Sequence, residues 1–145
     1  MTYMSSTDER NFIVDDYLRK IYGKAHCAVY AIGIQDGTPL KIGITTDLAK
    51  RIGQLQVGHW QKLKCHVITW TSSVEKSQLI ERKCHALLEK AQKHISGEWF
   101  TIDPEWAAKV IVHVADSLNI RTLSHSEMLK KFQKTEANRL DYFWK

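Results

Sequence analysis

Four side chains in this 145-residue sequence are candidates for a reactive site, because their types can carry protons or bind phosphate and metal ions. Tyr30 lies in an apolar stretch, Arg51 lies beside an apolar stripe, and Glu81 and His85 are four residues apart. On a helix that spacing places Glu81 and His85 on one face, where they form either a pair of ligands or proton carriers, or a simple surface pair. Taken alone, Tyr30 is typical of strand packing and Arg51 of a solvated flank with an apolar stem.

A hairpin and a helix are predicted to position the first two of these side chains. Residues 27–34 (CAVYAIGI) and 40–44 (LKIGI) favour strands, and they flank the turn signal QDGTP. A helix capped by Thr46 or Asp47 follows and ends near Gly58. Its apolar stripe, at spacings i, i+4 and i+7, is Leu48, Ile52 and Leu55.

The rest of the chain predicts one more full strand and several helices. In chain order these are a helix ending near Tyr22, a strand over 63–70, a helix from Ser72 or Ser73 to about Gln92, a short strand or turn over 97–102, a helix starting at Asp103-Pro104, and a final helix over 124–145. The predicted core residues of the later elements are Ile80, Cys84, Leu87, Leu88, Ala91, Trp99, Phe100, Trp106, Val110, Val114 and Leu118. This order predicts an α+β fold, with a small, mainly antiparallel three-stranded sheet flanked by helices and extra helices at both ends.

The run VYAIG, KIGITTDLAKRI, IERKCH and GEWF resembles the GIY-YIG nuclease superfamily. Val29-Tyr30 stands where the G-I-Y motif ends, and Lys41-Ile42-Gly43 stands in the place of Y-I-G. Arg51 matches the arginine on the family's first helix, and Glu81 matches its acidic metal ligand. The combination of K-I-G with a later E-x-x-x-H and G-E-W-F is similar to a branch that phages and mobile elements carry. The resemblance covers about half of the chain, roughly residues 26–102.

This resemblance implies a metal-dependent DNA endonuclease. Glu81 would hold one divalent ion, Mg²⁺ or Mn²⁺, and Arg51 would bind a phosphate oxygen through its planar fork. Tyr30 would act as general base if a metal or a neighbouring cation lowers its pKa. Lys41 would lower the pKa of Tyr30 or orient water, and His85 would serve as a further proton carrier or a metal ligand.

The register of the hairpin decides whether two of these residues meet. Side chains alternate between the faces of a sheet, so Tyr30 and Lys41 share a face only if Tyr30 pairs with an odd-numbered residue such as Gly43. If Tyr30 pairs with Ile44, the two side chains point apart. The sequence leaves both registers open.

Charge indicates a polyanionic partner, because the net charge is +5 and the pI about 9.1. We expect this partner to be double-stranded DNA, and double-strand cutting by a one-site domain would favour a homodimer. The candidate nucleic-acid contacts near the site are Lys50, Lys62, Lys64, Arg82 and Lys83. The C-terminal segment adds Lys130, Lys131, Lys134 and Arg139, and it either packs on the domain or contacts DNA.

Two other functions remain open at this point. Lys41 replaces the family's second tyrosine, and Ala28-Val29 replaces Gly-Ile in the first motif. These departures also fit a catalytically inactive DNA-binding or regulatory module. The aromatic C-terminus, Tyr142-Phe143-Trp144, fits a protein-interaction module. Glu98, beside two large apolar residues, either anchors the site or caps its segment.

Domain organisation and compartment follow from composition. We expect a helical extension over 1–25, a nuclease domain over 26–118 and a second helical extension over 119–145. Three cysteines without C-x-x-C spacing predict buried free thiols in a reducing compartment. With no signal peptide and no long apolar run, the chain is expected to be intracellular and cytoplasmic, without a membrane partner.

Overall fold

The computed structural model describes residues 2–3 and 26–131 of the chain. The helix predicted to end near Tyr22, and most of the helix predicted over 124–145, lie outside the described residues. The same holds for Lys134 and Arg139. Within the described part, the chain is helical over residues 125–131.

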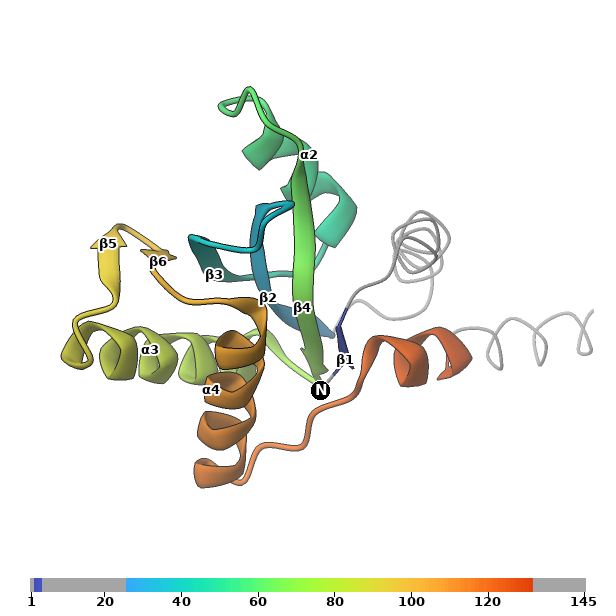
Figure 1. Cartoon of the computed structure of the whole chain (residues 1–145). Coiled ribbons are helices and arrows are strands. Elements are labelled where there is room, and N and C mark those ends of the chain that lie inside the picture. The colour runs from blue at the N-terminus through green and yellow to red at the C-terminus, as the bar shows by residue number, and fades with distance from the viewer. Residues whose placement is uncertain (1, 4–25, 132–145) are drawn as a thin grey trace, which may run out of the picture.

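A six-stranded sheet with the order β1-β4-β2-β3-β6-β5 forms the centre of the fold (Figure 1). Every pair of neighbouring strands is antiparallel. The three long central strands correspond to the three that the sequence predicts, and the α+β class is confirmed. The sheet is wider than expected because short strands extend both edges. The strands are β1 (Thr2–Tyr3), β2 (Cys27–Ile34), β3 (Leu40–Thr45), β4 (Leu63–Thr71), β5 (His94–Ser96) and β6 (Trp99–Phe100).

Three described helices begin where the sequence places a capping residue. They are α2 (Leu48–Gln56), α3 (Val74–Lys90) and α4 (Pro104–Ser117). The side chains of Asp47, Ser73 and Asp103 each accept a hydrogen bond from a backbone N–H in the first turn, which satisfies one unpaired donor. Among the described residues, no helix has both the length and the apolar character that a membrane span requires.

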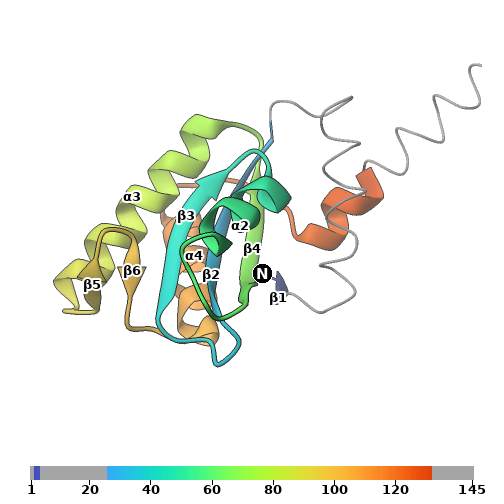
Figure 2. The same ribbon diagram turned by 90° about the horizontal axis from the view of Figure 1, so that it is seen from above.

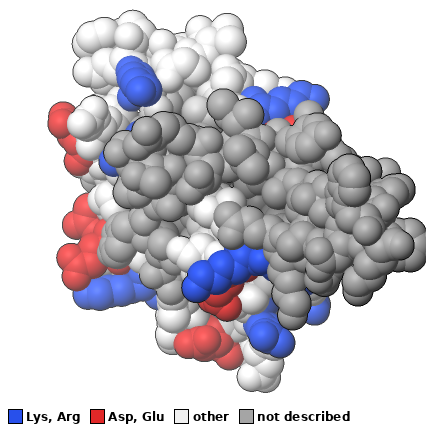
Figure 3. Space-filling view, turned by 90° about the vertical axis from the view of Figure 1, so that its right-hand side faces the viewer, with Lys and Arg blue, Asp and Glu red and all other residues white. Residues whose placement is uncertain are grey.

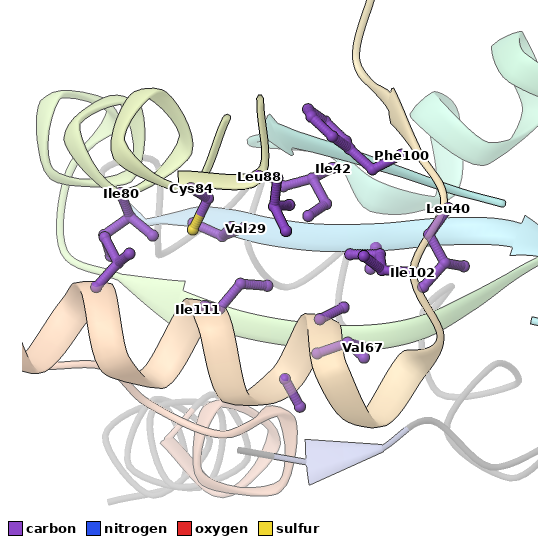
Figure 4. Packing of buried hydrophobic residues seen from close by; sticks show 14 of the residues in the cluster. Val29, Leu40, Ile42, Val67, Ile80, Cys84, Leu88, Phe100, Ile102 and Ile111 are labelled. Carbon is purple, nitrogen blue, oxygen red and sulfur yellow. The ribbon is translucent and has the colours of Figure 1, made fainter. Parts of the chain in front are cut away.

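The helices cover both faces of the sheet, with α2 in front of the central strands and α4 behind them in Figure 2. One apolar cluster joins the sheet to α3 and α4, with Ile80 and Ile111 packed on Val29 and Ile42 (Figure 4). A second cluster on the opposite face contains Tyr30, and Leu48 of α2 packs there. Because β2 is buried on both faces, its alternating side chains enter different clusters.

The predicted core faces of two helices need correction. Leu87 is 37% exposed and Trp106 is 55% exposed, although the sequence predicts both to be core residues. Ala91 is also exposed. The buried stripe of α3 is instead Ser77, Ile80, Cys84 and Leu88, and that of α4 is Ala107, Ala108, Ile111, Val114 and Ala115. Three of the five buried residues of α4 are alanines, whereas the buried stripe of α3 combines small and large residues.

The three cysteines are buried and free, as predicted. Cys84 lies in the cluster between α3 and the sheet, and burial there raises the pKa of its thiol to about 12. A thiol with so high a pKa is almost entirely protonated at neutral pH and is a poor nucleophile. Cys84 is therefore a packing residue.

Candidate active site

Tyr30 and Lys41 share one face of the β2–β3 hairpin. Tyr30 pairs with Gly43, and Lys41 pairs with Ile32, two residues further along β2. This is the register that the site hypothesis required, because side chains two residues apart on a strand point the same way.

Gly43 provides the space in which the Tyr30 ring lies. A Cβ atom added at Gly43 would lie 2.7 Å from Cζ of Tyr30 and closer still to its hydroxyl oxygen. The same Cβ would lie 3.2 Å from Oε2 of Glu98. The glycine of the K-I-G motif is thus required by the close approach of the tyrosine.

Substitution of Gly43 by alanine is expected to displace the Tyr30 ring. The Tyr30 ring is fully buried and Gly43 is buried within β3, so neither can move without cost. Overpacking of this kind lowers the free energy of unfolding by about 1–3 kcal/mol. Urea denaturation of Gly43→Ala beside Gly53→Ala measures this effect, because a Cβ at Gly53 of α2 meets nothing within 4 Å. Equal stability of the two variants would contradict the close contact.

Arg51 reaches Tyr30 from the helix α2. Its Nε donates a hydrogen bond to the Tyr30 hydroxyl oxygen at 3.1 Å. The apolar residues Leu48 and Ile52 pack on the cluster that contains Tyr30, and this packing holds α2 against the sheet. Arg51 is therefore a direct hydrogen-bond partner of the tyrosine and not only a solvated residue beside an apolar stripe.

The pKa of Tyr30 is raised from its ordinary value. Burial is the largest cause, and the negative charges of Glu98 and Glu81 add to it. Arg51 lowers the pKa through its hydrogen bond and its charge, but burial outweighs it. For Tyr30 to act as a general base, a cation would have to lower its pKa. The cationic groups of the protein do not lower it enough to offset burial. Without a further cation, the phenol is protonated at neutral pH.

Glu81 belongs to the same electrostatic cluster. It is half-buried on α3, and its carboxylate acts on the pKa of both Tyr30 and Arg51. The pKa of Glu81 is itself raised, first by burial and then by the charge of Glu98. Interactions with His85, Arg82 and Lys41 lower this pKa, but they only partly oppose the two effects that raise it.

Glu98 is a site residue that the sequence analysis left undecided. Its Oε2 lies 3.0 Å from Nζ of Lys41, and both side chains are largely shielded, at 36% and 12% exposure. Its backbone oxygen accepts a hydrogen bond from the Ile42 N–H at 3.0 Å. Of the two interpretations of Glu98, an anchor of the site fits this geometry. The signal was its position in G-E-W-F, but only the pairing of β6 with β3 brings it to Lys41.

His85 lies next to the cluster with one ring nitrogen already bonded. Its Nε2 donates to the backbone oxygen of Ile42 at 2.8 Å, and its ring lies 4.9 Å from that of Phe100. Phe100 is buried as predicted, whereas Trp99 is only half-buried. Action of His85 as a proton carrier would have to use Nδ1, and it stays a prediction.

The residues present suit a hard cation with few protein ligands. Among the described residues, no group of three or more His, Cys, Asp or Glu side chains is placed to enclose a metal ion. Mg²⁺ usually binds one or two carboxylates, keeps several waters and meets substrate phosphates. The half-buried carboxylate of Glu81, whose pKa is raised by burial and by the charge of Glu98, fits such an ion.

The candidate nucleic-acid contacts are distributed over several elements. Lys50, Lys62, Arg82 and Lys83 are exposed, and Lys64 is half-buried. Lys83 donates to the hydroxyl of Ser117 at 3.0 Å. Figure 3 shows the side of the molecule near β1, where basic and acidic side chains both appear on the visible part. That visible part therefore has mixed charge.

The start of the C-terminal segment packs on the domain. Leu123 and Trp70 exchange two backbone hydrogen bonds of 2.8 Å, and Met128 is buried in the cluster that contains Tyr30. Lys130 and Lys131 are exposed on the helical turns that follow. For residues 123–128, packing is therefore the observed arrangement.

A comparison with known protein families finds one family that matches the part of the chain carrying the candidate site. The model of the T5orf172 domain matches residues 27–115, which is more than half of the chain. The chain belongs to the T5orf172 domain family. This is a phage-type domain related to GIY-YIG nucleases. No curated protein and no solved structure matches the chain.

The T5orf172 match begins with β2 and ends within α4. It therefore includes the hairpin, α2, α3 and the turn between β5 and β6, which together carry Tyr30, Lys41, Arg51, Glu81 and Glu98. The whole cluster belongs to the domain that defines the family.

Proposed function

We propose that this T5orf172 domain is a metal-dependent DNA endonuclease of the GIY-YIG type. One observation carries the proposal: a phenol, a guanidinium, an ammonium and two carboxylates, from β2, α2, β3, α3 and the β5–β6 turn, act on one another at one place. Tyr30, Arg51 and Glu81 are linked by a hydrogen bond and by charge. This combination suits a phosphodiester, which needs cationic stabilisation and a proton acceptor for water.

Each side chain has a defined task in the proposed reaction. A water oxygen bonds to phosphorus while the bond to the leaving sugar oxygen breaks. Tyr30, in its ionised form, accepts the proton of that water. Arg51 keeps the phenol oriented through Nε, and its remaining N–H donors are suited to a non-bridging phosphate oxygen.

Glu81, with Glu98 beside it, would hold one Mg²⁺ or Mn²⁺ ion. Such an ion neutralises charge that develops on the phosphate and favours the deprotonated forms of groups near it. Glu98 also fixes the ammonium of Lys41 at 3.0 Å, so Lys41 is positioned through a carboxylate rather than through Tyr30. Lys41, which stands in place of the family's second tyrosine, is thus paired with Glu98, and the pairing of β3 with β6 brings the two residues together.

The proposed function is tested by incubating the full chain with supercoiled plasmid and Mg²⁺, Mn²⁺, Ca²⁺ or EDTA. We expect nicked or linear product with Mg²⁺ or Mn²⁺ and none with EDTA. Nicking alone would indicate a monomer acting on one strand, whereas linear product would favour a homodimer. Intact plasmid with every metal, from protein that is folded by circular dichroism, would refute the endonuclease.

A second candidate is a DNA-binding module that does not cut. It is favoured by the raised pKa of Tyr30 and by the engagement of Lys41 with Glu98. This candidate predicts DNA binding that weakens steeply as salt increases, without cleavage in any metal. The same plasmid assay, combined with a salt titration of binding, separates the two.

A further inference from the structure

The loop between α2 and β4, residues 57–62, carries an unusually exposed tryptophan. Trp60 is 93% exposed, although tryptophan side chains are highly buried on average. This loop projects from the top of the molecule in Figure 1. An indole ring held in water at this position is available to a partner.

The loop is held in one shape by Gln56, the last residue of α2. The Gln56 side-chain amide donates to the backbone oxygens of His59 and Gln61, at 3.2 and 2.9 Å. Its Oε1 accepts from the Leu63 N–H at 2.7 Å. These bonds bracket Trp60 on both sides. The exposure of Trp60 is therefore set by a loop geometry that these hydrogen bonds define.

The same loop adjoins the candidate active site. The ring of His59 lies 5.5 Å from that of Trp99, and Nζ of Lys41 lies 5.8 Å from the Trp99 ring centre. Trp99 follows Glu98 directly and pairs with Lys41 across β6 and β3. A ligand bound at the cluster would thus extend toward Trp60.

The segment of the chain that contains the loop is basic. Residues 48–74 contain no Asp or Glu, but they contain Lys50, Arg51, Lys62 and Lys64. An aromatic ring in a positive, carboxylate-free segment suits a nucleic acid, because phosphates meet the charges and a base meets the ring. Val57 of the same loop is also exposed, at 89%, but a protein partner would more often need a wider hydrophobic patch around the tryptophan.

We propose that Trp60 stacks on a nucleobase that is unpaired next to the cleavage site. The faces of bases inside a duplex are already covered by stacking, so an exposed indole gains a partner only where a base is unpaired or unstacked. The preferred substrate class is therefore DNA with a bulge, gap or branch. This inference rests on the proposed function, since it places the substrate at the same cluster.

The test measures DNA binding in EDTA, where no cleavage is required. Fluorescence anisotropy would compare a fully paired duplex with the same duplex carrying one bulged nucleotide. We expect the wild type to prefer the bulged DNA. Trp60→Ala should weaken binding to bulged DNA by about tenfold or more and change duplex binding little, whereas Trp60→Phe should keep most of the preference. Trp106→Ala, on the exposed face of α4, is the matched control and should have no effect.

Three results would overturn the inference. These are equal binding of both DNAs by the wild type, an equal loss on both DNAs in Trp60→Ala, and a change in oligomeric state in Trp60→Ala by light scattering without a change in bulge preference. The last result would assign Trp60 to a protein contact. Failure of the proposed function is distinguishable, because a bulge preference that depends on Trp60 can exist in a protein that never cuts.

Discussion

Replacement of Glu81 by glutamine is expected to lower metal-dependent DNA cleavage by roughly a thousandfold, the loss typical when a group that stabilises transition-state charge is removed. Glutamine keeps the size and polarity of the side chain but removes the charge that would hold the cation. The measurement is the initial rate of plasmid cleavage across a series of Mg²⁺ concentrations. Glu105→Gln is the matched control, because Glu105 is an exposed residue of α4 that pairs with Lys109.

Stability separates this loss from misfolding. The pKa of Glu81 is raised in the folded state, so the folded state disfavours its ionised form. The favourable contribution of the neutral form is present below the unfolded pKa and is lost as pH rises through the folded pKa. The neutral glutamine variant should therefore be at least as stable as the wild type at pH 7 and should show no advantage at acidic pH. Full cleavage activity in Glu81→Gln, or a large drop in its Tm at pH 7, would refute the assigned role.

Replacement of Tyr30 by phenylalanine is expected to lower the cleavage rate by about a hundredfold to ten-thousandfold, as for other general bases. The ring would still fill its place over Gly43, and only the hydroxyl that accepts from Arg51 would be lost. Thr69→Val is a suitable control, because it removes another buried hydroxyl, which donates to the Leu123 oxygen. It should leave the rate unchanged.

The pH dependence supplies a second readout for Tyr30. Because its pKa is raised, the ionised form that accepts a proton becomes more abundant as pH increases through the neutral range and above. The wild-type rate should rise with pH, and the residual rate of Tyr30→Phe should lose that rise. Identical pH profiles for the two proteins would exclude Tyr30 as the proton acceptor.

The electrostatics explain why the cluster is suited to activation by a cation. Two carboxylates raise the pKa of Tyr30, and one of them, Glu98, is paired with Lys41. Glu81 has no such close partner among the described ion pairs, and its own pKa is raised. A divalent ion at Glu81 would remove one of the causes that keep the phenol protonated. Binding of metal and ionisation of Tyr30 are in this way linked.

Local sequence determined the elements that carry the site. The turn signal of residues 35–39 and the strand-favouring residues around it predicted the hairpin. Capping residues also predicted three helix starts, at Thr46 or Asp47, at Ser72 or Ser73, and at Asp103, and the caps observed are Asp47, Ser73 and Asp103. These features depend on residues that are neighbours in the sequence and on backbone capping, so they can be predicted without knowledge of the tertiary structure. The resemblance of the motifs around Tyr30, Arg51 and Glu81 to the GIY-YIG superfamily also implied that these residues form a common site.

The tertiary structure decided what local patterns leave open. Both hairpin registers were compatible with the sequence, and the pairing of Tyr30 with Gly43 selects the one in which Lys41 joins the site. The place of Glu98 depends on β6 pairing with β3, a contact between strands more than fifty residues apart. The side of α3 and of α4 that faces the sheet depends on which stripe of residues packs best there. Each of these results from long-range packing, which the periodicity of one segment does not encode.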